Sequence, residues 1–408
     1  MKPTRHQFTV LKQVCDLVPP HLVSKLAREY GVEDKSRAIT PWSHVTAQMF
    51  TQVSHALSLN DVCDTLHNHE GVLTTIRRAA APSRNGFSHA NRTRNADMAE
   101  ALFWETLKDL QGRFPKFGMG RGYVGFPRRF KRIINVVDST TIQLVANCMD
   151  WAKHRRRKAA AKCHMRLDLE SFLPRFAVVK AASSHDDKEA WAVCAEISAG
   201  EVVVFDKAYV DFRHLWHLTR REVFWVTRAK TNMQYKVISE KSPAHGRILR
   251  DVIIRPTVWR TRKDYPGKLR LVEALVEVQG RDTVMTFITN NLAWSAGSIA
   301  ELYKARWGIE VFFKQIKQTL QLGDFLGHNE NAVRWQIWMA LLVYVLLRFI
   351  AYMGKWPHAF ARLFTLVRGV LWECYDLFGL LRTCGTASPP PRYRAAPEQA
   401  YLPGFALG

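Results

Sequence analysis

The sequence predicts an α/β domain with a β-rich insertion, preceded by an all-α domain. The chain has 408 residues, which is long enough for more than one domain. Residues 1–110 carry apolar side chains at helical spacing. From residue 132 onward, short runs of β-branched and aromatic residues alternate with helical segments, a pattern typical of α/β domains.

Helix start and stop signals divide residues 1–110 into several short helices. A Pro pair that begins at Pro19 interrupts the first helical pattern. Thr40 followed by Pro41 combines an N-cap residue with Pro at the first helical position. Ser88 is predicted to open a later, polar helix.

The charge of the chain points to nucleic acid as a partner. Lys and Arg number 59 and Asp and Glu number 36, which gives a formal net charge of +23. Hydrophobic residues make up 47% of the chain, so this charge belongs to a folded protein and not to a disordered basic tail. The alternative is a protein that is merely basic.

The polar helix after Ser88 provides candidate DNA contacts, Asn91 and Arg92. A bundle of short helices, one of them rich in Arg and Asn, predicts a DNA-end-binding domain of helix-turn-helix type within residues 1–110. A helical cap or a dimerisation domain would give the same pattern, and this alternative stays open.

Residues 111–131 form a basic connector, and the α/β domain is predicted to cover residues 132–350. A β-rich insertion is predicted at about residues 231–291. The remaining residues, 351–408, are predicted to form a helical segment and a flexible Pro-rich tail. The strands outside the insertion are predicted at 133–137, 176–179, 202–205 and 224–227.

Cysteine usage and the lack of an apolar leader favour a cytoplasmic location. The seven Cys residues include no Cys-x-x-Cys pair, which argues against a disulfide framework or a zinc ribbon. The N-terminal residues contain no apolar signal region. The most apolar run, residues 337–347, is too short to cross a bilayer, so no membrane partner is expected.

Two Asp residues directly follow predicted strands. Asp138 comes after residues 133–137, and Asp206 comes after residues 202–205. Ligands gather at such strand ends in open α/β sheets. A later helix, opened by Ser295 or Ser298, supplies Glu310. Three carboxylates from two strands and a helix could hold two Mg²⁺ or Mn²⁺ ions, a pair suited to phosphodiester displacement.

The helix with Glu310 also carries Tyr303, Arg306 and Lys317. Their spacing places all four side chains within about 60° of one another around the helix, beside an apolar stripe. The two cations could therefore contact a phosphate near the acids. Arg306 and Glu310 are also an i,i+4 pair, so an ordinary surface ion pair is the alternative.

A basic run at residues 153–158 includes Arg155, Arg156 and Lys158. These side chains could bind DNA backbone phosphates. A solvated loop would have the same composition.

These motifs resemble those of bacterial insertion-sequence transposases with an RNase H-like DDE catalytic domain. The resemblance is to the branch marked by Tyr-x2-Arg-x3-Glu-x6-Lys, which is matched here from Tyr303 to Lys317. It includes the segments around Asp138 and Asp206 and covers most of the chain up to about residue 350. Ala208 departs from the family, which usually has Gly at that position.

The resemblance implies a chemistry for the three acids. Asp138, Asp206 and Glu310 would hold two divalent ions while water cleaves the transposon end and frees a 3′-OH. That 3′-OH would attack the opposite strand to give a hairpin, and the reopened ends would then join target DNA.

The resemblance also implies DNA contacts and a dimer on DNA. Tyr303, Arg306 and Lys317 would contact phosphates near the cut, and residues 231–291 would be the family's insertion. Trp259 in that insertion is a candidate to stack on a flipped base. Two alternatives stay open: a catalytically silent or domesticated DNA-binding protein, and an RNase H-like nuclease that cuts without strand transfer.

Overall fold

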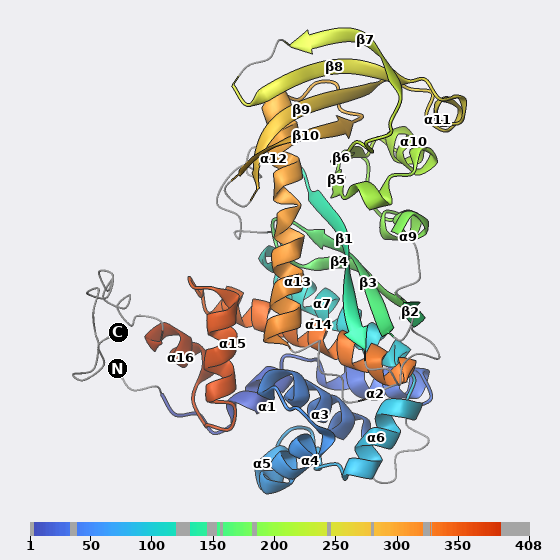
Figure 1. The fold of residues 1–408 in the computed structure, drawn as a ribbon. Coiled ribbons are helices and arrows are strands. Elements are labelled where there is room, and N and C mark those ends of the chain that lie inside the picture. The colour runs from blue at the N-terminus through green and yellow to red at the C-terminus, as the bar shows by residue number, and fades with distance from the viewer. Residues whose placement is uncertain are drawn as a thin grey trace, which may run out of the picture.

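The computed structural model has a mixed α/β fold in which one large sheet stands above a base of helices (Figure 1). The mixed α/β class predicted from the sequence is confirmed. The part of the chain that the structure describes comprises residues 4–32, 39–119, 131–144, 153–155, 158–181, 186–242, 246–278, 281–320, 327 and 329–384.

The strands form a ten-stranded sheet in the order β2-β3-β1-β5-β6-β10-β9-β8-β7, with β4 paired to β3. Strands β1, β5 and β6 pair in parallel, whereas the other pairs are antiparallel. The four strands predicted outside the insertion fall on β1, β4, β5 and β6. The bounds are β1 Ile134–Leu144, β2 Lys153–Arg155, β3 Lys158–Asp168, β4 Pro174–Ala181, β5 Val202–Phe205, β6 Phe224–Arg228, β7 Tyr235–Ser242, β8 Ile248–Pro256, β9 Leu269–Val278 and β10 Arg281–Thr289.

The predicted insertion extends the main sheet and does not form a sheet of its own. Its last strand, β10, pairs antiparallel with β6, and β9, β8 and β7 follow outward. The prediction did not include β7 or the short helix α11 (Trp259–Asp264). Buried side chains of the insertion join the core beside β5 and β6, including Val252, Leu271 and Ile288.

The N-terminal part of the base is a group of short helices, as predicted. Thr40 caps α3, and its Oγ1 accepts a hydrogen bond from the backbone N–H of Ser43 at 3.0 Å. The polar helix begins earlier than predicted because Ser83, and not Ser88, caps it. The bounds are α1 Val10–Cys15, α2 Pro20–Glu29, α3 Pro41–Ser54, α4 Leu59–Asn68, α5 Glu70–Leu73, α6 Arg84–Thr93, α7 Asp97–Arg113 and the 3-10 helix η2 Pro115–Gly118.

Helix α14 (Glu330–Met353) runs through the base and packs against α3, α6 and α7. The apolar run predicted at residues 337–347 is therefore part of a longer helix of 24 residues. Among the residues described, this helix alone is long and apolar enough to cross a membrane, but 78% of its apolar window is buried inside the protein.

Both ends of the described chain meet beside α15 (Phe360–Gly369) and α16 (Leu377–Thr383). The backbone N–H of His6 donates to the Cys374 carbonyl at 2.8 Å, and that of Asp376 donates to the Thr4 carbonyl at 2.9 Å. The predicted tail beyond residue 384 and residues 120–130 of the predicted connector lie outside the described residues.

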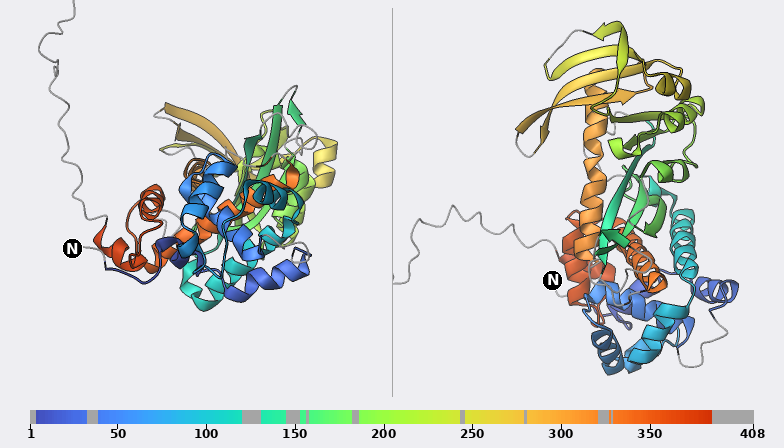
Figure 2. Two further views of the ribbon diagram at one scale, coloured as in Figure 1. Left: turned by 90° about the horizontal axis from the view of Figure 1, so that it is seen from below. Right: turned by 45° about the vertical axis from the view of Figure 1, so that its right-hand side comes forward.

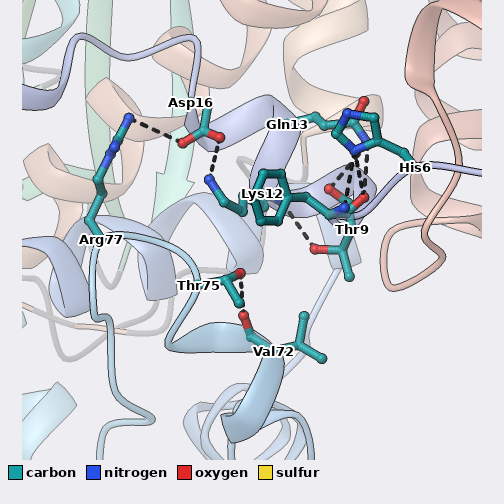
Figure 3. Close-up of polar contacts among 9 residues, drawn as sticks. His6, Thr9, Lys12, Gln13, Asp16, Val72, Thr75 and Arg77 are labelled. Atoms are coloured by element: carbon teal, nitrogen blue, oxygen red, sulfur yellow. Dashed lines mark hydrogen bonds and ion pairs between the residues drawn. The ribbon is translucent and has the colours of Figure 1, made fainter.

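A cluster of charges fixes α1 to the segment after α5 (Figure 3). Asp16 pairs with Lys12 at 2.5 Å and with Arg77 at 3.3 Å. The Lys12 ammonium also lies 4.3 Å from the centre of the Phe8 ring. These contacts hold the first helix against the base.

A long helical rod links the sheet to the base, as Figure 2 shows. It consists of α12 (Ala296–Ala305) and α13 (Trp307–Thr319), joined at Arg306. The remaining helices, α9 (Asp186–Val193), η5 (Lys207–Tyr209) and α10 (Phe212–Arg220), belong to the α/β part.

Candidate active site

The register of the sheet brings Asp138 and Asp206 to the same level. In the parallel pair of β1 and β5, Val137 lies opposite Phe205, and Asp138 and Asp206 are the residues that follow these two in the chain. Neighbouring strands lie about 4.8 Å apart, so the two carboxylates are near neighbours. The prediction that β1 ends at Asp138 is wrong, because β1 continues beyond it in antiparallel pairing with β3. What ends at Asp138 is the parallel pairing with β5.

Asp206 begins the turn that follows β5. Its Oδ1 accepts a hydrogen bond from the Ala208 backbone N–H at 3.1 Å. Ala208 is not among the non-Gly residues of positive φ in the described chain. The turn therefore does not require Gly here, and this sequence tolerates Ala at that position.

The rod supplies the third acid. Ser295 caps α12, since its Oγ accepts a hydrogen bond from the Ser298 backbone N–H at 3.1 Å. The single helix predicted here is divided at Arg306, whose backbone remains right-handed helical. Leu302 and Ile309 are fully buried, so the predicted apolar stripe anchors the rod and turns its polar edge toward β1.

Arg306 joins two of the three acids. Its Nη1 donates to Asp138 Oδ2 at 2.5 Å, and its Nη2 donates to Glu310 Oε1 at 2.6 Å. The Arg306 side chain is only 10% exposed. The i,i+4 pair with Glu310 thus exists, but the same guanidinium also reaches the strand that carries Asp138. An ordinary surface ion pair would not make this second contact.

Tyr303 contacts the remaining acid. Its hydroxyl donates to Asp206 Oδ2 at 3.4 Å, and its ring centre lies 5.0 Å from that of Phe287. Burial raises the pKa of Tyr303 to about 12, so the hydroxyl keeps its proton at neutral pH.

The electrostatics of Asp138 reflect its crowded surroundings. Burial raises the pKa of Asp138 to about 6, against the lowering effects of the Arg306 guanidinium and the Ser139 backbone N–H. The carboxylates of Asp206 and Glu310 raise this pKa further, so all three acids lie close enough to interact. A cation in this place relieves that repulsion, and Arg306 supplies one.

The acids do not converge on a common point. Among the residues described, no three His, Cys, Asp or Glu side chains lie close enough together to hold a metal ion. Asp138 and Glu310 both turn toward Arg306. Sequence spacing alone could not predict this arrangement of the acids, because the contact between Arg306 and Asp138 joins a helix to a strand that is distant in the sequence.

A cleft of about 450 Å³ opens between β1 and α13 beside Asp138 and Glu310. Lys317 donates from Nζ to the Thr141 carbonyl at 2.6 Å and so ties α13 to β1. Lys314 also lines the cleft, although it was not among the predicted site residues. Its signal was the four-residue step from Glu310, which places both on one helix face. The lining residues are Asp138, Ser139, Thr140, Glu310, Phe313, Lys314 and Lys317.

The two candidate DNA contacts of α6 differ in exposure. Asn91 is buried, and its Oδ1 is 2.8 Å from His44 Nε2 and 2.6 Å from Gln48 Nε2. The prediction of Asn91 as a DNA contact does not fit this structure, because its amide is used within the core. Arg92 is exposed on α6.

The remaining candidates are Trp259 and the basic run of residues 153–158, and Trp259 does not line the cleft. Trp259 begins α11 and is 74% exposed, with the Lys263 ammonium 5.4 Å from its ring centre. The backbones of Arg155 and Lys158 lie in β2 and β3. Arg156 lies outside the described residues.

Similarity to known proteins agrees with this arrangement. The transposase DDE domain family matches residues 129–346, and a domain of unknown function matches residues 6–76. The chain therefore belongs to the DDE transposase family, and the resemblance inferred from the motifs is confirmed.

The curated relatives are named as transposases. The putative transposase y4zB of Sinorhizobium fredii is 31% identical over 75% of this chain and 83% of its own length. The probable transposase for insertion sequence element IS5377 of Geobacillus stearothermophilus is 31% identical over 54% of this chain and 58% of its own. Among solved structures, a piggyBac transposase synaptic complex with hairpin DNA matches with a TM-score of 0.46 and 10% identity, covering 96% of this chain and 85% of that one.

Proposed function

We propose that this transposase binds the terminal inverted repeats of its own insertion sequence, cleaves the DNA there and joins the freed ends to target DNA. The observation that supports the proposal is that strand register places Asp138 and Asp206 at the same level of neighbouring strands, while Arg306 bridges Asp138 to Glu310. A hairpin intermediate and a dimer on DNA are part of the proposal.

The donor chemistry at this place fits divalent ions. Asp138, Asp206 and Glu310 offer carboxylate oxygens, the ligands that Mg²⁺ and Mn²⁺ prefer. The guanidinium already shared by Asp138 and Glu310 indicates that these carboxylates accept a common cation. Two bound ions would supply charge stabilisation of the attacking and leaving oxygens of the phosphodiester.

The protein's own groups orient the DNA strand. Arg306 presents a planar fork that suits phosphate oxygens as well as carboxylates. Tyr303, with its proton retained, is a donor at neutral pH beside Asp206. Lys317 holds α13 against β1 and so keeps Glu310 facing Asp138.

DNA binding draws on surfaces away from the cleft. The net charge of +23 favours a polyanion, and α6 presents Arg92 to solvent. Trp259 offers an exposed ring in the insertion for stacking on a base. The strand order β4-β3-β1-β5-β6, with acids after β5 and within β1, supports the RNase H-like assignment of residues 132–350.

A strand-transfer assay tests the proposal. The full chain is incubated with Mg²⁺, a duplex that carries the element's terminal repeat and a plasmid target. We expect nicked and hairpin ends followed by joined products. Cleavage without joining would indicate a nuclease, and binding without cleavage would indicate a silent DNA-binding protein; either result contradicts the proposal.

A further inference from the structure

We infer that the buried hydrogen bond between Tyr209 and His164 is a positioning contact that sets the place of Asp206 relative to Asp138. This inference rests on the proposed function, because it takes these two acids as ligands of the same pair of divalent ions. It assigns a role to two residues that were not among the predicted site residues.

The backbone ladder between β1 and β5 stops just before the two acids. Val137 and Phe205 are the last residues of its parallel register, and Asp138 and Asp206 come next. From there the two segments differ, since β1 continues as a strand while β5 gives way to the turn η5. The distance between the two carboxylates therefore depends on contacts outside this ladder.

The turn η5 is closed on Asp206 by backbone hydrogen bonds. The Tyr209 N–H donates to the Asp206 carbonyl at 3.0 Å, and Asp206 Oδ1 accepts from the Ala208 N–H at 3.1 Å. The position of Tyr209 is thus coupled to that of Asp206 through one short turn. A contact that holds the Tyr209 side chain holds this turn as well.

The side chain of Tyr209 is held from a different strand. Its hydroxyl lies 3.0 Å from Nδ1 of His164 on β3, and the two residues are 1% and 0% exposed. Strand β1 lies between β5 and β3 in the sheet, so this bond spans the strand that carries Asp138. His164 is the register partner of Ser139, the residue after Asp138. The bond therefore ties the turn of Asp206 to the level of Asp138 in the sheet.

This bond lies on the face of the sheet opposite the rod. Cys163 and Met165, the neighbours of His164 on β3, pack in one apolar cluster with the rod, so strand alternation turns His164 to the other face. Tyr209 belongs to the apolar cluster of that other face. The rod thus contacts the acids of the sheet from one face, and the Tyr209–His164 pair supports the turn from the other.

The geometry of the acids matters for the ions that they would hold. Mg²⁺ demands near-ideal octahedral coordination, so a small displacement of one carboxylate weakens binding. Loss of an outer-shell partner of a metal ligand typically costs about 10- to 100-fold in metal affinity. Tyr209 acts on Asp206 through the backbone and not through the carboxylate, so we expect an effect of roughly 10-fold, at the lower end of this range.

The test measures the Mn²⁺ affinity of the full chain bound to a duplex that carries the element's terminal repeat. Free Mn²⁺ is followed by electron paramagnetic resonance, with the duplex alone as the blank, so the readout does not depend on cleavage. Tyr209→Phe removes the hydroxyl and keeps the ring. We expect roughly 10-fold weaker Mn²⁺ binding in this variant, with unchanged DNA affinity in EDTA.

The matched control is Tyr265→Phe. Tyr265 is also 1% exposed, belongs to the same apolar cluster as Tyr209, and its hydroxyl lies 3.1 Å from Oγ1 of Thr219. Both substitutions remove a buried hydroxyl contact and should lower the melting temperature to a similar extent, but Tyr265→Phe should keep the wild-type Mn²⁺ affinity. Wild-type Mn²⁺ affinity in Tyr209→Phe, with only its melting temperature lowered, would overturn the inference.

A second pair of variants tests the other partner of the bond. His164→Asn keeps a polar atom at the place of Nδ1, whereas His164→Leu, of nearly the same size, does not. Both variants lose Nε2, so a difference between them reports on the bond to Tyr209. We expect tighter Mn²⁺ binding in His164→Asn than in His164→Leu, and equal binding would contradict the positioning role. If the wild-type complex takes up no Mn²⁺ beyond that of the duplex, the proposed function fails instead.

Discussion

At the scale of single residues, the hydrogen bonds of Arg306 determine how Asp138 and Glu310 are arranged. Its guanidinium donates to the oxygens of Asp138 and Glu310 that a divalent ion would also use. Ion binding and the Arg306 contacts therefore compete for the same carboxylates.

The competition between Arg306 and a divalent ion predicts how Mn²⁺ changes the melting temperature. Arg306→Gln should melt below the wild type in EDTA, because the half-buried Asp138 then loses its charged partner. Mn²⁺ should raise the melting temperature of the variant more than that of the wild type. The control is Arg334→Gln, which removes a guanidinium that pairs with Asp97 and Glu100 away from the cleft. Equal Mn²⁺ shifts in Arg306→Gln and the wild type would contradict the competition.

The lowered pKa of the buried His44 is expected to make the stability of the protein depend on pH. Burial lowers the pKa of His44 to about 3 from an ordinary value of 6.5, and the nearby Arg94 lowers it further. The unfolded chain therefore binds more protons, so stability falls as pH falls from about 6.5 toward about 3. His214, with a pKa lowered to about 4 by burial, acts in the same direction.

The measurement is thermal melting across this pH range. His44→Gln should lose less stability on acidification than the wild type, because Gln does not titrate and can still donate to Asn91. A parallel loss in both proteins would show that His44 does not carry the effect.

At the scale of elements, one buried ion pair holds the insertion to the rod. Arg270 on β9 binds both oxygens of Asp251 on β8, at 2.7 and 2.8 Å, and both side chains are 1% exposed. Arg270 also donates to the Trp294 carbonyl, just before α12. The pair thus connects the outer strands with the start of the rod.

Arg270→Met should lower the free energy of unfolding by about 3–5 kcal/mol, since it leaves Asp251 charged and buried. The matched control is Arg247→Met, which breaks an exposed pair with Asp282 in the same sheet. The control should cost about 0–1 kcal/mol. Urea unfolding of the two variants measures both values, and equal losses would contradict the role assigned to burial.

Helix α6 gives a prediction about sequence recognition. Arg92→Ala in the full chain should reduce the preference for the terminal repeat over a scrambled duplex by roughly 1–3 kcal/mol. The full chain is required because α14 completes the core around α3, α6 and α7. Lys25→Ala, an exposed change on α2, is the control. An unchanged preference in Arg92→Ala would exclude Arg92 from recognition.

The sequence predicted the elements better than their contacts. Thr40 and Ser295 marked helix starts correctly because capping is local. The burial of Asn91 was missed, since it depends on His44 and Gln48 of another helix. The signature spacing correctly placed Arg306 beside Glu310, but its bond to Asp138 spans 168 residues and depends on strand register.

For the whole molecule, the rod of α12 and α13 runs from the sheet to the base (Figure 2). The apolar core is continuous from the N-terminal helices through α13 and α14. The predicted boundaries at residues 110, 131 and 350 stay predictions. Because Glu310 lies on the rod, a shift of the rod relative to the sheet would change its position against Asp138.

The central claim is that Asp138, Asp206 and Glu310 form one catalytic centre. The most direct test is single-turnover cleavage of a pre-bound terminal-repeat duplex with Mg²⁺ by the Ala variant of each acid. Binding and melting are measured in parallel, with Glu301→Ala, an exposed acid of the same rod, as the control. We predict that each of the three variants binds and folds but does not cleave, whereas the control cleaves at the wild-type rate. Wild-type cleavage by any of the three variants would contradict the claim.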